Sequence, residues 1–285
     1  PASPGRRAPG VVPSGGSERT NQQRVDGEAH YGPNTAICLS DFWSCATGRS
    51  DYLCGDHIDL WHAIARAGRL RLDVSPPVLY SFRRCPYAMR ARLAILASGV
   101  SVELREIVLQ QKAPEFLASS PKGTVPVLVT PTVVIEESFD VMLWALERSD
   151  PEGWLAMPEA GYDWIARCDG PFKTALDHTK YAVRYPELDP EQERGRAAEF
   201  LADLDLKIAG SDWLFGPKCT LADMAIVPFV RQFANSDRSW FDAQPWPNLQ
   251  RWLSEFLASD RFAAIMTKYP KWQAGDPPVL FPNPA

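Results

Sequence analysis

Four consecutive residues, Cys85-Pro86-Tyr87-Ala88, carry the strongest chemical signal in this sequence. An apolar run that begins at Val78 precedes them and predicts a short buried strand. The pattern then predicts a helix that begins at Cys85, because Pro86 suits the first helical position and Gly99 suits the helix end. Apolar residues follow at helical spacing, at Met89, Leu93, Leu96 and Val100.

The position of Cys85 predicts a reactive sulfur. A thiol at a helix N-terminus faces unpaired backbone N–H groups and the positive end of the helix dipole, and both favour the thiolate. Arg83 and Arg84 add positive charge beside it. We therefore expect a sulfur that is ionised and nucleophilic near neutral pH. The alternative is an inert core cysteine, which is the commoner fate of a single cysteine.

The turn looks like a C-x-x-C dithiol motif in which alanine replaces the second cysteine. A paired motif closes its own disulfide, whereas Cys85 has no partner at position 88. A mixed disulfide on Cys85 must therefore be resolved by an outside thiol, for which glutathione is the abundant cytosolic candidate.

Residues 78 to about 270 resemble the cytosolic glutathione transferase family, specifically its cysteine-type, omega-like and glutaredoxin-like bacterial branch. The resemblance implies a thioredoxin-like α/β domain followed by an all-helical bundle domain. It also implies glutathione as co-substrate without a metal, thiol transfer through a mixed disulfide at Cys85, and a homodimer. Four motifs in the family's order carry the resemblance: the turn at Cys85, Thr124-Val125-Pro126, Glu137-Ser138 and Thr220-Leu221-Ala222-Asp223.

The segment Thr124-Val125-Pro126 is expected to contact the cysteinyl unit of glutathione. An X-Pro bond adopts the cis form at low cost. The loop proline of this family is cis, which turns the backbone N–H and C=O of Val125 toward the ligand. The alternative is an ordinary proline that begins a strand.

Glu137 and Ser138 open a predicted helix at 138–146, whose N-terminus offers free N–H groups to an anion. The resemblance implies that Ser138 binds the γ-glutamyl carboxylate and that Glu137 attracts the neighbouring ammonium group. An N-cap role for Ser138 is compatible with this. Lys112 resembles the residue that meets the glycine carboxylate, and Lys122 is the alternative. Either lysine can also be a plain surface charge.

Two other functions are compatible with these motifs. Other branches of the family activate the thiol of glutathione with Tyr or Ser for conjugation, and Tyr80 and Ser81 precede the turn. Some relatives keep the fold as a non-catalytic binding module. The complete set of motif residues favours an enzyme, and Cys85 favours thiol transfer over conjugation.

The second substrate is expected where the helical domain faces Cys85, which is the hydrophobic site in this family. Tyr87, Tyr181, Arg184 and Trp240 are candidates for its lining. The sequence does not choose among them, since aromatic residues at helical spacing are more often core residues.

Length and charge limit the class of protein. The chain has 285 residues, 45% of them hydrophobic, and a formal net charge of −5. This charge argues against a nucleic-acid partner, and no apolar run of about 18 residues predicts a membrane span. We expect a disordered low-complexity extension, a thioredoxin-like domain, a helical domain and a Pro-rich tail, at 1–76, 77–150, 154–272 and 273–285.

The six cysteines are scattered, which predicts free thiols in a reducing compartment such as the cytoplasm. Arg6-Arg7 is not followed by an apolar stretch, so an export signal is not expected. A zinc set is conceivable, but its members contain no C-x-x-C pair, and we expect no metal. That set is Cys38, Cys45, Cys54 and His57.

The pattern also predicts the remaining elements. Thr220 and Asp223 form a capping-box variant that starts a core helix, and no strand is expected after a linker at 149–153. The expected elements are a strand at 102–109, a short helix within 112–120, a hairpin of 127–129 and 133–135, and helices at 191–209, 221–235, 247–258 and 260–268.

Overall fold

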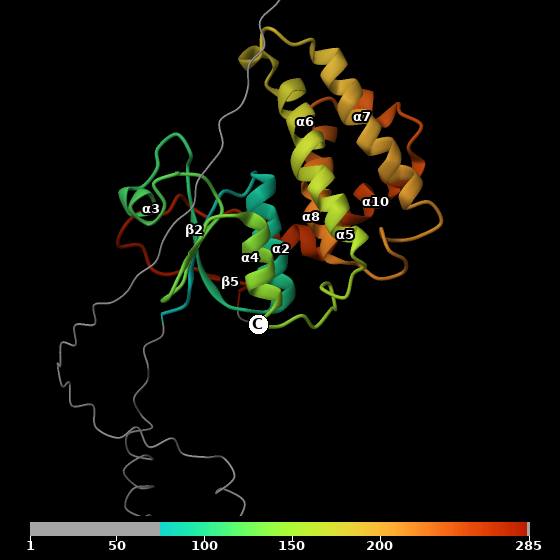
Figure 1. Ribbon diagram of the computed structural model, residues 1–285. Coiled ribbons are helices and arrows are strands. Elements are labelled where there is room, and N and C mark those ends of the chain that lie inside the picture. Colours follow the sequence, from blue (N-terminus) through green and yellow to red (C-terminus); the bar gives the residue numbers. More distant parts are fainter. Residues whose placement is uncertain (1–74, 284–285) are drawn as a thin grey trace, which may run out of the picture. The chain divides into compact units, whose positions relative to one another are not determined.

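The computed structural model describes residues 75–283 of the chain (Figure 1). The four candidate zinc ligands and all but the end of the predicted 1–76 extension lie outside the described residues. The described part consists of a mixed sheet with its helices, followed by a set of helices. The predicted thioredoxin-like α/β unit followed by an all-helical unit is therefore confirmed.

The sheet has five strands in the order β4-β3-β1-β2-β5. β1 pairs with β2 in parallel, and the other three pairings are antiparallel. Helices α2 (Pro86–Ser98) and α4 (Ser138–Leu146) pack against each other beside this sheet, and α3 spans Pro114–Ser119 (Figure 1). The strands are β1 (Val78–Ser81), β2 (Val102–Glu106), β3 (Val127–Val129), β4 (Val134–Ile135) and β5 (Leu280–Phe281).

Strand β5 is a difference from the sequence-based expectation, because it lies in the segment expected to be a Pro-rich tail. Leu280 pairs with Glu103 of β2, and Phe281 pairs with Val102. The Phe281 side chain is buried in the core. A two-residue strand between prolines carries no alternation that a sequence pattern can detect.

Helix α2 begins and ends as the sequence predicts. Cys85 occupies the N-cap position, Pro86 is the first helical residue, and Gly99 closes the helix with φ 70°. This left-handed conformation favours glycine. Val100 lies beyond the helix end, so its predicted place on the helix was wrong.

Strand β2 ends earlier than predicted, at Glu106 rather than at position 109. The backbone N–H of Ile107 donates to the carbonyl of Ser81 at 2.7 Å, and a turn begins after it. The second strand of the hairpin begins at Val134 rather than at the predicted position 133. Val133 belongs to the turn, since its carbonyl accepts the N–H of Thr130 at 2.9 Å.

The helical part confirms the predicted helices to within a few residues. The helix α8, which follows Thr220, packs against α2 and α5, so it joins the two parts (Figure 1). A π-helical turn at Cys168–Phe172 separates α5 from α6 and contains Pro171. The elements are α5 (Ala160–Arg167), α6 (Lys173–Lys180), a 3-10 turn (Ala182–Arg184), α7 (Pro190–Lys207), α8 (Leu221–Ala234), α9 (Arg238–Asp242), α10 (Pro247–Ala258) and α11 (Asp260–Ile265).

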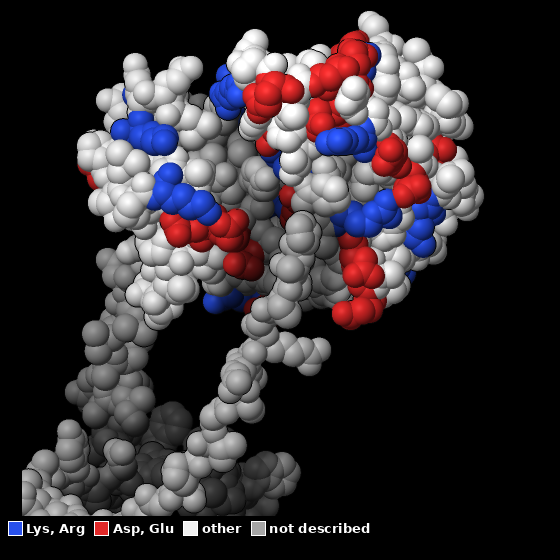
Figure 2. Space-filling model, turned by 45° about the horizontal axis from the view of Figure 1, so that its top comes forward, with Lys and Arg blue, Asp and Glu red and all other residues white. Residues whose placement is uncertain are grey.

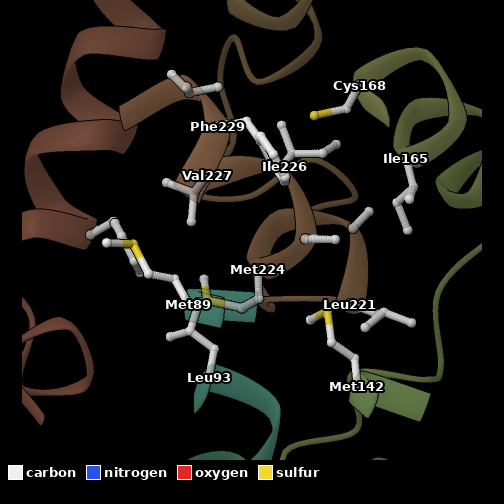
Figure 3. Close-up of a cluster of buried hydrophobic side chains, with 14 of the residues drawn as sticks. Met89, Leu93, Met142, Ile165, Cys168, Leu221, Met224, Ile226, Val227 and Phe229 are labelled. Carbon is white, nitrogen blue, oxygen red and sulfur yellow. The ribbon is translucent and has the colours of Figure 1, made fainter. Parts of the chain in front are cut away.

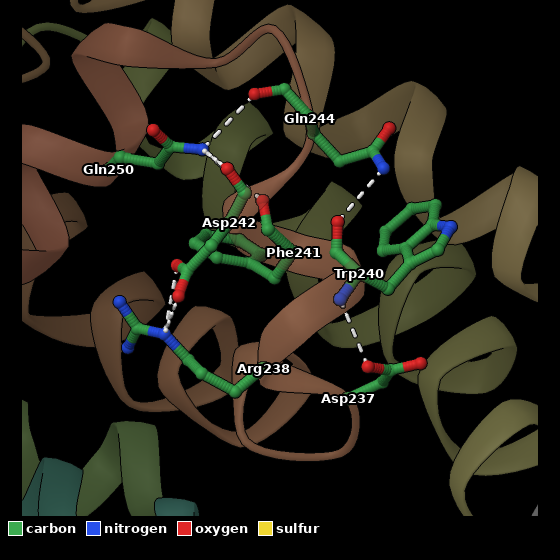
Figure 4. A network of polar contacts seen from close by, with 7 residues as sticks. All are labelled: Asp237, Arg238, Trp240, Phe241, Asp242, Gln244 and Gln250. Carbon is green, nitrogen blue, oxygen red and sulfur yellow. Dashed lines mark hydrogen bonds and ion pairs between the residues drawn. The ribbon is translucent and has the colours of Figure 1, made fainter.

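Helix α9 was not predicted, and side chains hold it in place (Figure 4). Asp237 accepts the backbone N–H of Trp240 at 3.0 Å and so caps its start. At its end, the Gln250 amide donates to the carbonyls of Phe241, Asp242 and Gln244 at 3.1–3.2 Å. A five-residue helix of this kind depends on its surroundings more than on its own sequence.

The core between the two parts is apolar (Figure 3). Met89 and Leu93 of α2 and Met142 of α4 lie together with Met224 and Val227 of α8, and all five are buried. Burial of such side chains supplies the main favourable term in folding. The start of α2 is therefore held against a rigid surface.

Two buried arginines tie α2 to both parts of the molecule, and Arg92 also donates to the carbonyl of Ile265 in α11 at 3.0 Å. The Arg90 guanidinium donates to both carboxylate oxygens of Asp169 at 2.6 and 3.0 Å, and its Nε donates to the carbonyl of Ala225. The Arg92 guanidinium pairs with Glu106 of β2, and its Nε donates to the Ser81 hydroxyl at 2.8 Å. Buried charges persist only when they are paired in this way.

The capping box at the start of α8 is present. The Asp223 carboxylate accepts the backbone N–H of Thr220 at 2.9 Å and its hydroxyl at 2.7 Å. It also accepts the backbone N–H of Leu214 at 2.9 Å. Thr220 and Asp223 are both buried, so these bonds satisfy donors that water does not reach.

We expect Asp223→Ala to lower the free energy of unfolding by about 2–4 kcal/mol, because it leaves two buried N–H groups without acceptors. Urea unfolding followed by circular dichroism measures the change. The matched control is Asp260→Ala, which removes an exposed first-turn acid of α11 and should cost less than about 1 kcal/mol. Equal losses for the two variants would contradict the buried role of Asp223.

Candidate active site

Cys85 lies where strand β1 turns into helix α2. Its backbone N–H donates to the carbonyl of Phe82 at 2.9 Å, and its carbonyl accepts the N–H of Met89 at 2.9 Å. The sulfur Sγ lies 3.7 Å from the carbonyl oxygen of Val125, to which the thiol donates. The strand, the turn and the helix therefore fix the sulfur next to the Val125 loop.

A cavity of about 510 Å³ opens at this sulfur. All seven site residues predicted from the sequence line it, although they come from four separate stretches of the chain. A volume of this size suits a small-molecule ligand. Sequence reasoning did not identify Leu109, Gly123 and Glu136. The predicted residues in the lining are Cys85, Lys112, Thr124, Val125, Pro126, Glu137 and Ser138.

The Val125–Pro126 peptide bond is cis, as predicted. Val127 begins strand β3 directly after it, so the proline also precedes a strand, as in the alternative interpretation. The Val125 side chain is buried beside β3, and its carbonyl faces Cys85. The loop thus brings backbone groups to the sulfur.

Helix α4 begins at Ser138, as predicted, and Glu137 occupies the N-cap position. The N-cap role considered for Ser138 was therefore wrong, since Ser138 is the first helical residue. The Glu137 carbonyl accepts the N–H of Val141 at 3.0 Å. Ser138 is buried, yet it lines the cavity. Its hydroxyl therefore lies at the cavity next to the free N–H groups of this helix end, a geometry of the kind that favours anions in proteins.

Both candidate lysines line the cavity, in different environments. Lys122 forms an ion pair with Glu137, and both side chains are more than half exposed. Such a surface pair contributes at most about 1 kcal/mol, so a charged ligand can replace it. Lys112 forms no ion pair with any of residues 75–283.

The Lys112 side chain lies directly against the backbone of Gly123. A Cβ atom at Gly123 would lie 2.9 Å from Lys112 Nζ, and the backbone φ of Gly123 is +62°. The left-handed conformation favours glycine, and the small residue leaves room for the flexible end of Lys112. The loop that carries Thr124 and Val125 therefore packs directly on the lysine.

The ionisation of Cys85 differs from the prediction. Burial raises the pKa of the Cys85 thiol above its ordinary value. The backbone N–H groups of Ala88 and Tyr87, followed by the charges of Lys173 and Arg92, lower this pKa in part without cancelling the effect of burial. The prediction of an anion near neutral pH was thus wrong, because the sequence shows the helix dipole but not the depth of the site.

Tyr80 and Ser81, the rival residues for a conjugating enzyme, are both buried and do not line the cavity. The Tyr80 hydroxyl accepts a hydrogen bond from Arg105 at 2.8 Å. The Ser81 hydroxyl accepts one from Arg92 at the same distance. Both hydroxyls are thus bonded to arginine side chains and do not face the cavity.

A second cavity of about 410 Å³ lies on the other side of Cys85 and Tyr87, which line both cavities. Three of the four candidates for a second-substrate site line it, namely Tyr87, Tyr181 and Arg184. Trp240 does not, because it packs against Phe233 and Trp246. The two cavities meet at the sulfur.

The part of the chain that the structure describes contains neither a candidate metal site nor a candidate membrane helix. No group of three or more His, Cys, Asp or Glu side chains is arranged to hold a metal ion there. Within the same residues, no helix has both the length and the apolar character needed to cross a membrane.

Two family models match the chain. Residues 79–153 match the glutathione S-transferase N-terminal domain, and residues 162–255 match the corresponding C-terminal domain. Together these matches cover more than half of the chain. They coincide with the sheet part and the helical part of the fold.

Curated relatives have low identity but good coverage. The maleylacetoacetate isomerase of Mus musculus is 25% identical over 222 residues, which is 73% of this chain and 99% of the relative. Glutathione S-transferase D7 of Drosophila melanogaster is 27% identical over 195 residues, 61% of this chain and 81% of the relative.

Solved structures share the fold. A glutathione transferase family member from Pseudomonas fluorescens, with two glutathione bound, superposes with a TM-score of 0.59 at 19% identity. That match covers 72% of this chain and 97% of the other. A Pseudomonas putida glutathione transferase with one glutathione disulfide per subunit gives a TM-score of 0.59 at 18% identity, covering 71% and 95%.

We expect the alkylation rate of Cys85 to rise with pH. The midpoint of this rise should lie above the ordinary pKa of a thiol, since burial disfavours the thiolate. Lys173→Gln should move the midpoint further up, because the Lys173 charge lowers the pKa of Cys85. Iodoacetamide labelling read by mass spectrometry of the Cys85 peptide measures both.

The control for this experiment is Lys268→Gln, which removes an exposed lysine that lines neither cavity. Its midpoint should match the unmodified protein. A midpoint below the ordinary thiol value in the unmodified protein would restore the original prediction of an ionised sulfur.

Proposed function

Since the chain belongs to the glutathione S-transferase family, we propose that it is a glutathione-dependent thiol transferase or reductase in which Cys85 is the nucleophile. The observation that carries the proposal is the place of the Cys85 sulfur, at the N-cap of α2 and at the junction of two cavities. An inert core cysteine would have no such access.

Glutathione occupies the first cavity in this proposal. The γ-glutamyl carboxylate binds the Ser138 hydroxyl and the N-terminus of α4, and Glu137 pairs with the ammonium group. The cysteinyl unit bonds the backbone of Val125 in the Thr124-Val125-Pro126 loop. The glycine carboxylate meets Lys112, which has no competing ion pair among the described residues.

The reaction has two steps. The Cys85 thiolate attacks the glutathionyl sulfur of a mixed disulfide R–S–S–G, forms a disulfide with glutathione and releases R–S⁻, which takes up a proton. A second glutathione thiolate then attacks the glutathionyl sulfur on Cys85, which releases the Cys85 thiolate and glutathione disulfide. The net change is R–S–S–G plus glutathione to R–SH plus glutathione disulfide.

The N–H groups of Tyr87 and Ala88 serve the thiolate in this scheme. They lower the pKa of Cys85 against the dominant effect of burial, and they stabilise the charge that returns to the sulfur in the second step. Since burial raises the pKa of the Cys85 thiol, deprotonation of Cys85 precedes the first attack in this scheme. Thiol transfer should therefore accelerate toward alkaline pH.

Conjugation of electrophiles is the second candidate function. It is less well supported, because Tyr80 and Ser81 are buried and bonded to arginines. A non-catalytic binding module is the third candidate, and the open, lined cavity at Cys85 argues against it. Calorimetry with glutathione distinguishes it from both enzymes by an absence of binding.

Location and assembly follow from the same proposal. Cys85, Cys168 and Cys219 form no disulfide, which supports a reducing compartment such as the cytoplasm. We propose a homodimer on the ground of the family resemblance. Light scattering after gel filtration tests this assembly directly.

Cys85→Ser is expected to lower the rate of thiol transfer by about 100-fold or more, because a serine hydroxyl does not form the mixed disulfide. The rate of glutathione oxidation with a mixed disulfide substrate measures it. Intact mass spectrometry after exposure to glutathione disulfide should show one adduct in the unmodified protein, mapped to Cys85 and reversed by glutathione.

Cys219→Ser is the matched control, since this half-buried cysteine lies outside both cavities. It should keep both the rate and the adduct. Retained conjugation of an electrophile in Cys85→Ser, together with unchanged thiol transfer, would overturn the assignment of Cys85.

Ser138→Ala should weaken glutathione binding by about 10- to 100-fold, since a hydrogen bond to a charged group contributes about 1.5–3 kcal/mol. Isothermal titration calorimetry gives the dissociation constant. Ser119→Ala is the control, because the exposed Ser119 hydroxyl donates only to the carbonyl of Glu115 within α3. Identical affinities for the two variants would remove Ser138 from the site.

A further inference from the structure

The second cavity is cationic, and we propose that it selects thiol substrates that carry carboxylates. Its lining includes the cationic side chains of Arg84, Lys173, Lys180 and Arg184 and a single carboxylate, that of Asp177. This inference rests on the proposed function for its reaction. It departs from the hydrophobic second site that the family resemblance led us to expect.

Only one of the four cations is neutralised within the described residues. Lys173 forms an ion pair with Asp177, one turn further along α6. Arg84, Lys180 and Arg184 form no ion pair with any of residues 75–283. Three uncompensated positive charges therefore face a cavity of about 410 Å³, a volume suited to a small molecule.

Aromatic rings position these cations without removing their charge. The Arg184 guanidinium lies 4.6 Å from the centre of the Tyr181 ring, and Lys180 Nζ lies 5.5 Å from it. From the turn before α2, the Arg84 guanidinium lies 5.4 Å from the centre of the Phe82 ring. Such contacts hold a cation over a ring face and leave its N–H groups free for an anion.

The positive charge of Lys180 is repelled by other positive charges nearby. Burial lowers the pKa of Lys180, Asp177 raises it, and the nearby charges of Lys173 and Arg231 lower it further. A bound carboxylate would offset this repulsion. Because arginine binds carboxylates in bidentate geometry, Arg84 and Arg184, which both line the cavity, suit such a group.

The positive charge is a local property of the cavity. The whole chain has a formal net charge of −5, and Figure 2 shows acidic and basic side chains interspersed over the face it presents. The lining has four cationic side chains and one acidic side chain. Its net charge is thus positive, whereas that of the whole chain is negative. Arg84, Lys180 and Arg184 are exposed, so the local positive charge acts at a surface that solvent and a small ligand can reach.

The chemistry of the exchange gives the cations a role beyond binding. With the glutathionyl half of R–S–S–G in the first cavity, the R group occupies the second. Attack by the Cys85 thiolate breaks the S–S bond and places the departing electron pair on the R sulfur. Negative charge therefore develops in the cationic cavity, where Lys180 and Arg184 stabilise it in the transition state.

Three mixed disulfides of glutathione test the proposal, made with mercaptosuccinate, 2-mercaptoethanol and cysteamine. Their R groups are acidic, neutral and cationic. We expect kcat/KM for the acid to exceed that for the neutral substrate by about tenfold, with the amine lowest, after correction for the uncatalysed rate. The preference should shrink as salt increases.

Two variants change the charge in opposite directions. Lys180→Gln with Arg184→Gln should reduce the ratio of acid to neutral kcat/KM to about one, since two cations are lost. Asp177→Asn should increase that ratio, because it frees the Lys173 charge. The control, Lys207→Gln with Lys268→Gln, removes two positive charges outside both cavities and should leave the ratio unchanged.

A binding measurement separates this inference from the proposed function. Calorimetry on Cys85→Ser, which does not turn over, should show tighter binding of the acidic than of the neutral mixed disulfide. Equal kcat/KM for the three substrates would overturn the cationic site and leave thiol transfer intact. Absence of turnover with all three would overturn the proposed function, while tighter binding of the acid would still support the site.

Discussion

Helix α2 carries two buried guanidinium groups that tie it to both parts of the molecule, and the position of the Cys85 sulfur depends on this helix. Arg90 reaches Asp169 and Ala225 in the helical part. Arg92 reaches Ser81 and Glu106 in the sheet and also the carbonyl of Ile265 in the helical part. Neither arginine adds much net stability compared with apolar packing, because desolvation of the charges is costly. Their effect is geometric, since together they fix the helix that begins at the cavities relative to the sheet and to the helical part.

The depth of the site sets its chemistry. The same burial that shields Cys85 from water raises its pKa, and the helix N-terminus only partly compensates. A sulfur of this kind is a weaker nucleophile at rest than an exposed thiolate, and it is also less prone to adventitious oxidation, which needs the thiolate. Cys168 is still less reactive, since burial raises its pKa to about 12.

Much of the fold and of the first cavity could be predicted from sequence, because local rules decide those features. Proline at the first helical position and glycine at the end define α2, and the Val125–Pro126 segment and the start of α4 follow known motifs. Strand β5 and helix α9 could not be predicted, since distant partners hold them. The raised pKa of Cys85 and the charge of the second cavity depend on burial and on side chains from separate elements, which no short motif encodes.

Strand β5 makes the order of synthesis matter for this protein. Val279, Leu280 and Phe281 bond the outer side of β2, and the N–H of Trp272 donates to the carbonyl of Glu106. The sheet that begins near residue 78 is thus completed by a strand that follows the whole helical part in the chain. Until that strand is made, β2 is an open edge able to pair with other chains. The five-stranded sheet is consequently complete only after the helical part has been synthesised.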